Sequence, residues 1–300
     1  FSYNLVSGTR EALTYDSLLE GGQEDRYLKV SSIQENIYLG IFAMSNLLSV
    51  VTVALGYRKA YFISIVQGIL SSFVAMRLSE VNVGRENKKE KLTCADIRRE
   101  IILYTGQSLR FLKNNLPVCR RMMLGGIVAA GCYVVNMMMQ EHLVSCGLKA
   151  GWIGIPLLCI SLFSMAGAVF VGKTEQVQLK KLMFAGSLAA GFFIALSSSP
   201  AVVVSVFAAG MAHGAEEVLM LRIESENQKV FSSEIRATMV SVSSMMYSIF
   251  MVILSPLTGW AVERLSIETA FAGLGILVAG VGMILCWKPE SSVDKHSRKL

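Results

Sequence analysis

Apolar runs of about 20 residues, separated by short polar stretches, dominate this chain. A helix rises about 1.5 Å per residue, so a run of this length crosses the roughly 30 Å hydrocarbon layer of a bilayer. The runs are continuous and do not alternate with polar positions, which predicts transmembrane helices that satisfy their own backbone hydrogen bonds. Eight complete spans are predicted, at about Ile33–Leu55, Ala60–Leu78, Met122–Met139, Trp152–Val171, Leu182–Ser198, Ala201–Leu221, Thr238–Trp260 and Ile267–Trp287.

The front of the chain predicts an incomplete helix. It opens at Phe1 inside an apolar stretch that runs to about Leu19, and this stretch is too short to span from its visible start. We therefore expect the chain to be truncated at the front. Ser32 and Glu35 have capping-box spacing, which predicts the N-terminus of the next helix and a structural role for Glu35.

Composition supports a membrane protein. Hydrophobic residues make up 53% of the chain and charged residues 17%, with a mean hydropathy of +0.52. Such an apolar excess must face lipid, which predicts an all-α membrane protein in the cell membrane. The net charge of +6 does not predict a nucleic-acid partner, because the basic residues lie in short loops between apolar spans.

One long polar interruption divides the chain. The stretch 79–121, with Arg77 included, carries eleven Lys or Arg against five acids, and its second part has an amphipathic pattern. If it is cytoplasmic, the inside loops and the C-terminal tail hold 23 Lys or Arg and the outside loops hold four, so we expect a cytoplasmic C-terminus. The predicted units are a partial N-terminal bundle 1–78, the central loop 79–121, a six-helix bundle 122–287 and the tail 288–300.

A weak internal repeat agrees with this division. The stretch Gly8–Leu13 matches Gly214–Leu219 at an offset of 206 residues. Parallel repeats about an axis normal to the membrane are one architecture of secondary transporters.

Several stretches carry a family resemblance. Ser7–Leu18 is similar to the fourth-helix signature of a group of prokaryotic major facilitator superfamily members. Ser233–Ser241 resembles the start of the eleventh helix and Ser255–Gly259 its end. Met139–Leu143, with Gly147 and Leu148 after it, resembles the end of the seventh helix.

The resemblance implies a major facilitator-like two-bundle fold that begins within the fourth helix, with a partial first bundle and a complete second one. It implies a monomeric secondary transporter that moves a small molecule by alternating access, coupled to protons, with efflux favoured over uptake. The family's Gly-rich acidic and basic loop belongs to a region that is absent here, and its pseudo-repeat at 168–181 lacks the usual acid. The alternative is a transport-inactive membrane protein, either a sensor-like paralogue or a truncated remnant.

Ionisable residues inside predicted spans are functional candidates, because each costs at least about 2.5 kcal/mol at membrane depth. Arg10 and Glu11 align with Glu216 and Glu217 under the repeat offset. Because helices four and ten flank the central cavity in the family, we predict an Arg10–Glu216 ion pair, which either responds to substrate and protons or fixes the bundles together. His213 shares a helix face with a carboxylate and is either a proton relay or a packing residue.

Two further groups complete the candidate site. Tyr133, Asn136 and Gln140 form a polar stripe on one helix, interpreted as substrate hydrogen-bonding groups or as interhelical polar contacts. By family analogy, Arg236 forms a cytoplasmic gate with an acid of the opposite bundle's loops, such as Glu20 or Glu24.

No enzyme motif, nucleotide-binding loop or cofactor signature is present in the sequence, which predicts no enzymatic activity. The six cysteines show no CxxC pair and no histidine at ligand spacing, so we interpret them as free thiols with no metal. Glycines in several spans, among them Gly167 and Gly275, predict close helix packing.

Overall fold

A computed structural model of the chain describes residues 2–77, 106–108 and 110–287. For residues 2–10, several residues between 47 and 60, and two others, only the backbone is described. Most of the predicted central loop and the whole tail 288–300 lie outside the described residues, and so does most of the amphipathic pattern in that loop.

Every regular element in the described part of the chain is helical. Two helices open the chain, α1 (Ser2–Glu20) and α2 (Tyr27–Leu55), joined by a short 3-10 turn at Glu24–Arg26, and α3 (Tyr57–Ala75) follows. The remaining helices are α5 (Leu116–Ser145), α6 (Gly154–Phe170), α7 (Leu179–Leu196), α8 (Val202–Gln228), α9 (Ser233–Arg264) and α10 (Ile267–Trp287).

Six of these helices are long and apolar enough to cross a membrane, which confirms the prediction of an all-α, multi-pass membrane protein in its general form. They are Leu116–Ser145, Gly154–Thr174, Leu179–Leu196, Val202–Gln228, Ile235–Arg264 and Ile267–Cys286. The other two predicted spans fall on α2 and α3, which are not among them. The apolar part of α3, Tyr61–Ala75, is shorter than a span, and only part of the α2 side chains is described.

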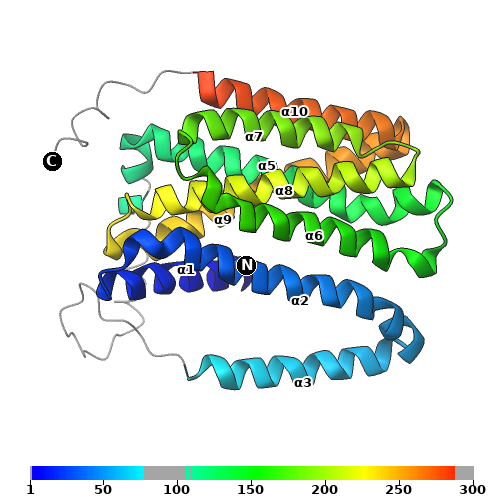
Figure 1. Ribbon diagram of the computed structural model, residues 1–300, viewed down its shortest axis with the longest axis horizontal. Coiled ribbons are helices and arrows are strands. Elements are labelled where there is room, and N and C mark those ends of the chain that lie inside the picture. Colours follow the sequence, from blue (N-terminus) through cyan, green and yellow to red (C-terminus); the bar gives the residue numbers. More distant parts are fainter. Residues whose placement is uncertain (1, 78–105, 109, 288–300) are drawn as a thin grey trace.

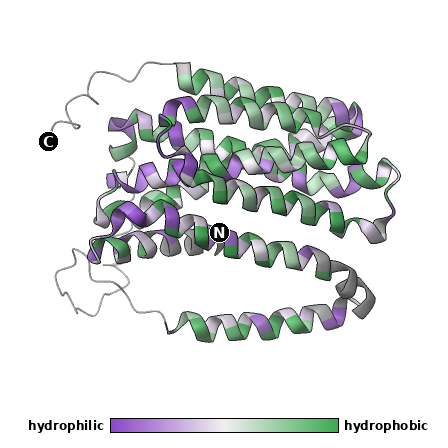
Figure 2. Cartoon of the chain, viewed as in Figure 1, coloured by the Kyte–Doolittle hydropathy of each residue, from purple (hydrophilic) through white to green (hydrophobic). Residues whose placement is uncertain are grey.

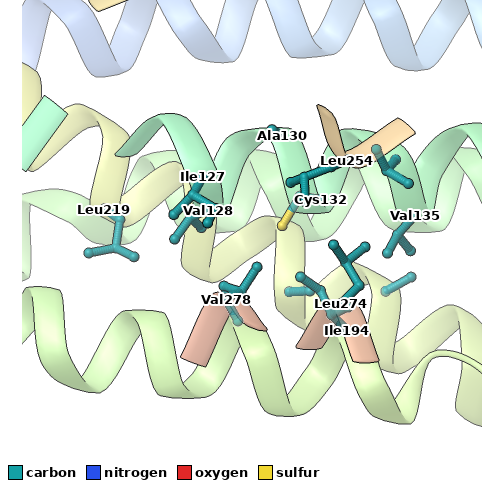
Figure 3. Close-up of a cluster of buried hydrophobic side chains, with 14 of the residues drawn as sticks. Ile127, Val128, Ala130, Cys132, Val135, Ile194, Leu219, Leu254, Leu274 and Val278 are labelled. Carbon is teal, nitrogen blue, oxygen red and sulfur yellow. The ribbon is translucent and has the colours of Figure 1, made fainter. Parts of the chain in front are cut away.

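Helices α5 to α10 pack into one bundle with α5 at its centre (Figure 1). Val128 and Cys132 of α5 are fully buried in one hydrophobic cluster with Ile194 of α7 and Val278 of α10 (Figure 3). Hydrophobic residues predominate along the middle of the helices, and polar residues gather toward the ends of the bundle (Figure 2). The apolar side chains therefore both form the core and cover the outer surface, as a bilayer requires.

The first three helices lie along one side of this bundle. Helix α1 packs against α9, and α2 packs against α6. Helix α3 contacts mainly α2 and lies apart from the bundle in Figure 1. Its large apolar side chains, such as Phe62 and Leu70, are exposed.

Charge is distributed unevenly between the two ends of the bundle. We call the end at which α5 and α7 begin the basic end, because its described loops and helix ends carry more Lys and Arg than the other end, among them Arg26, Lys29, Lys113, Arg120, Arg121, Lys173, Lys180, Lys181, Lys229 and Arg236. At the opposite end, the loops and helix ends among the described residues carry Arg58, Lys59, Lys149 and Arg264. This difference agrees with the predicted alternation of loops, and the cytoplasmic position of the basic end stays a prediction.

Two boundaries differ from the predicted ones. Helix α5 begins at Leu116 rather than near Met122, with Pro117 in its first turn, where proline is tolerated. Helix α2 begins at Tyr27, because the helix extends back to bury Tyr27 and Leu28. The predicted capping box is therefore wrong: Ser32 lies inside α2, and its hydroxyl donates to the Ala168 carbonyl of α6.

Candidate functional site

An imidazole and a carboxylate pair in the interior of the bundle, near the middle of α8. His213 Nδ1 lies 3.1 Å from Glu216 Oε2, and the two side chains are 13% and 15% exposed. An ionised carboxylate only accepts hydrogen bonds, so the Nδ1 proton points to Glu216 in that state. His213 Nε2 is buried and has no hydrogen-bond partner in the described part of the chain, which leaves its lone pair available to a proton.

Cys132 of α5 adjoins this pair. Its sulfur, one His213 nitrogen and one Glu216 oxygen lie within 4.8 Å of one another. These donor types are the ones that zinc takes in proteins. Because Glu216 is already engaged by His213, and Cys132 is fully buried in the apolar core, we interpret the group as a hydrogen-bonding cluster.

Two cysteines lie near histidines. Cys132 approaches His213 from another helix, and Cys146 Sγ lies 3.7 Å from His142 Nε2 one helical turn away. Only the second pair contradicts the sequence interpretation that no cysteine has a histidine at ligand spacing. The first contact joins α5 to α8 and leaves no trace in sequence spacing. The second has the i, i+4 spacing of a helix and was visible in the sequence.

Two more carboxylates act on this site. Glu217 follows Glu216 on α8 and interacts electrostatically with both Glu216 and Glu35 of α2. Glu35, predicted to have a structural role at a helix start, is therefore part of a carboxylate group between α2 and α8. Like charges at membrane depth repel strongly, so such a group is costly to place there.

The predicted Arg10–Glu216 pair stays a prediction, because the Arg10 side chain lies outside the described residues. Glu11 is half-buried on α1, and the helix that α1 packs against is α9. The described partner of Glu216 is His213 on its own helix.

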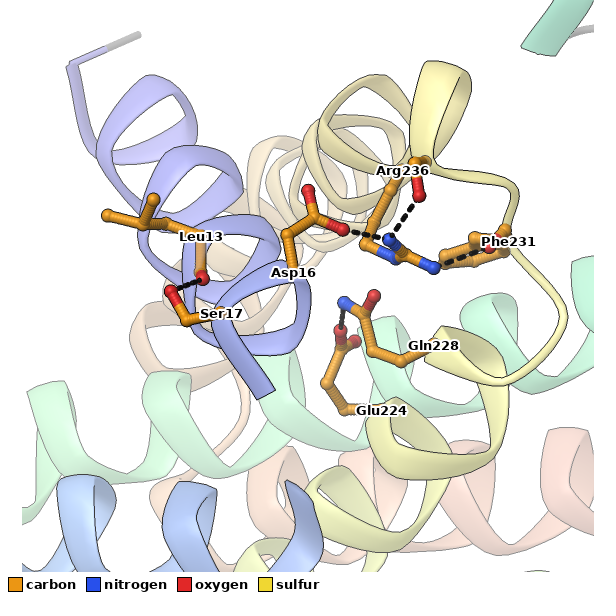
Figure 4. Close-up of polar contacts among 8 residues, drawn as sticks. Leu13, Asp16, Ser17, Glu224, Gln228, Phe231 and Arg236 are labelled. Carbon is orange, nitrogen blue, oxygen red and sulfur yellow. Dashed lines mark hydrogen bonds and ion pairs between the residues drawn. The ribbon is translucent and has the colours of Figure 1, made fainter. Parts of the chain in front are cut away.

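A second polar centre joins α1 to α9 at the basic end, around Arg236 (Figure 4). The Arg236 side chain is 4% exposed, and its Nη1 pairs with Asp16 Oδ1 of α1. Its Nη2 donates to the Phe231 carbonyl at 2.7 Å, and Nη1 donates to Ser233 Oγ at 3.2 Å. The guanidinium carbon lies 4.2 Å from the centre of the Tyr15 ring, a cation–π contact.

Arg236 thus pairs with Asp16, inside α1, and not with the predicted Glu20 or Glu24. Glu20 and Glu24 are exposed at and beyond the end of α1. Asp16 and Glu20 are four residues apart and share a helix face, and only Asp16 lies deep enough to meet α9. The four-residue separation of Asp16 and Glu20 was the sequence signal from which Asp16 could have been predicted as the partner of Arg236.

The polar stripe on α5 lies on a face that the bundle does not bury. Tyr133 is 47% exposed, Gln140 is exposed and Asn136 is half-buried. The Tyr133 ring meets Tyr247 of α9 edge to face at 6.3 Å between ring centres. Two of the three side chains thus present polar groups outward from α5, on a different face from the buried Cys132.

A scan against models of known protein families finds no match, and a search of curated proteins finds no similar sequence.

Proposed function

We propose that this chain is a secondary active transporter of the major facilitator type, which moves a small molecule across the cell membrane by alternating access with proton coupling. The observation that carries the proposal is the His213–Glu216 pair, in the apolar interior of a multi-pass helical bundle. Glu217 follows it on α8 and interacts electrostatically with Glu35 of α2. Ionisable side chains at membrane depth are costly and mark ion or proton paths.

In this proposal, a proton exchanges at the cluster that bridges α2 and α8. Either His213 receives the proton at Nε2, or the proton passes from His213 Nδ1 to Glu216 through the 3.1 Å contact. Protonation removes negative charge between α2 and α8, and so changes the relative energies of two packings of these helices. A proton gradient drives the cycle if the proton binds the two packings with different affinity.

The contact between α1 and α9 supplies the part that opens. At the basic end of this contact, Arg236 and Asp16 form an ion pair beside the buried Tyr15 and Phe231. A charged pair that forms and breaks suits a gate.

The exposed stripe of Tyr133, Asn136 and Gln140 is the proposed substrate surface, with Met137 on the same face. A phenol, two amides and a thioether suit an amphipathic organic molecule that has a hydrogen-bonding group. On this basis we propose efflux by antiport, with the basic end in the cytoplasm and a monomer as the working unit.

Replacing Glu216 with glutamine abolishes proton-linked flux in this account, because the amide cannot carry a proton while its shape is kept. The chain is reconstituted in liposomes loaded with a pH-sensitive dye, a pH gradient is imposed, and a panel of amphipathic cations, sugars and amino acids is added one at a time. We expect at least one compound to trigger proton movement in the unchanged protein and none in Glu216→Gln.

The matched control is Glu141→Gln, which makes the same chemical change at an exposed position on α5. This variant keeps the flux of the unchanged protein. If no compound moves protons with the unchanged protein, the transport-inactive alternative is favoured, and equal flux in Glu216→Gln removes this carboxylate from the coupling path.

A further inference from the structure

A cavity of about 330 Å³ opens at the basic end, between α5, α7, α8 and α10 and away from the proton site. Three cationic side chains line it, Arg120 and Arg121 from α5 and Lys180 from α7. The acid in its lining is Glu226 of α8.

The cavity has an excess of positive charge. Glu226 Oε1 is already paired with Lys229 Nζ at 2.9 Å and lies 3.5 Å from Arg222 Nη1. The negative charge of Glu226 is therefore balanced by Lys229 and Arg222, which do not line the cavity. Arg120 and Lys180 then act on whatever occupies the cavity, and an anion is the complementary occupant.

The start of α7 adds to this preference. Leu179, the first residue of this helix, lines the cavity. The side chain at its N-cap position, Gln178, makes no capping hydrogen bond. Backbone N–H groups at a helix start favour an anion, and phosphate is a common one.

The other walls of the cavity are apolar. Leu179, Met183 and Leu285 line it together with the cations. Next to them, Phe184 of α7 and Ile284 of α10 are exposed on the outer surface of the bundle, where lipid chains lie. An occupant with a phosphate and attached hydrocarbon matches both the cationic lining and the apolar surface, whereas free phosphate matches only the cationic lining.

We propose that this cavity binds the phosphate headgroup of an anionic phospholipid, with Arg120, Arg121 and Lys180 as its ligands. Basic pockets between transmembrane helices at the cytoplasmic surface are suited to such headgroups. The hydrocarbon chains then run along the surface of α7 and α10. This site does not depend on the proposed transport activity.

The test measures lipid binding to the delipidated full chain in detergent by native mass spectrometry, with phosphatidylglycerol, phosphatidylcholine and inorganic phosphate as separate probes. We expect phosphatidylglycerol to bind more tightly than phosphatidylcholine. Each lining cation near the surface contributes about fivefold in affinity, so Lys180→Gln weakens phosphatidylglycerol binding about fivefold and Arg120→Gln with Arg121→Gln roughly thirtyfold.

The matched control is Lys181→Gln, which removes the same charge from the next residue of α7, outside the cavity lining. It keeps the affinity of the unchanged protein. Equal loss in Lys180→Gln and Lys181→Gln shows diffuse surface attraction and overturns the site, as does equal binding of the two lipids. Saturation by inorganic phosphate with no preference for lipid overturns the lipid assignment. If the double arginine variant does not fold, the two lysine variants decide the outcome.

Discussion

Replacing Arg236 with glutamine lowers the free energy of unfolding by about 2 to 4 kcal/mol, because it breaks a largely buried ion pair and leaves Asp16 without its cation. The substitution also removes the hydrogen bond to the Phe231 carbonyl and the contact with the Tyr15 ring. Asp16 is 21% exposed, so water solvates part of its unpaired charge. The expected loss of stability is therefore smaller than the full cost of an unpaired buried charge. Equilibrium unfolding in mixed detergent micelles measures it.

Two comparisons make this result interpretable. Lys229→Gln breaks a surface pair with Glu226 near the same end of the bundle, where the lysine is 52% exposed, and costs at most about 1 kcal/mol. The exchange Asp16→Arg with Arg236→Asp restores the ion pair but not the stacking on Tyr15, so we expect partial recovery. An Arg236→Gln protein as stable as Lys229→Gln contradicts a stabilising role for the Arg236 centre.

Replacing Gly275 with valine prevents α7 and α10 from packing, and we expect little folded protein to be recovered. A Cβ at Gly275 meets the backbone oxygen of Gly191 and the backbone nitrogen of Ala195, and a Cβ at Gly191 meets the backbone of α10 in return. Overpacking a core costs about 1 to 3 kcal/mol when side chains move aside, and backbone atoms cannot move in this way. The cost therefore exceeds about 3 kcal/mol by the same comparison. Monodisperse protein after size-exclusion chromatography is the readout.

Gly280→Val is the matched control on the same helix. A Cβ at Gly280 has no neighbour within 4 Å, so this variant is recovered like the unchanged protein. Equal recovery of Gly275→Val and Gly280→Val contradicts the close contact between α7 and α10.

Hydropathy predicted the six helices of the main bundle because each contains an apolar stretch long enough to cross a membrane. It failed at boundaries that depend on neighbours. Tyr27 and Leu28 follow a polar stretch, yet they are helical because tertiary packing buries them. Helix α5 begins at Leu116, and the buried Val118 in its first turn packs with Phe231, just before α9, and with Met239 of α9.

Sequence spacing found the part of the site that lies on one helix. His213 and Glu216 are three residues apart, and helical geometry alone brings them together. Cys132, Glu35 and Asp16 join the two centres from α5, α2 and α1. Their positions depend on which helices become neighbours, and no single-helix pattern contains that information.

The central claim, alternating access with the Arg236 centre as a gate, is tested most directly by distances between α1 and α9 at the basic end. Spin labels are attached at Glu20→Cys of α1 and Ala237→Cys of α9, both exposed, after the native cysteines are replaced by serine, and the protein is studied in lipid nanodiscs.

The account predicts two distance populations whose ratio changes between acidic and alkaline buffer. Arg236→Gln increases the population with the longer distance, and Glu216→Gln removes the change of the ratio with pH. A single distance that neither pH nor Arg236→Gln alters would contradict the account.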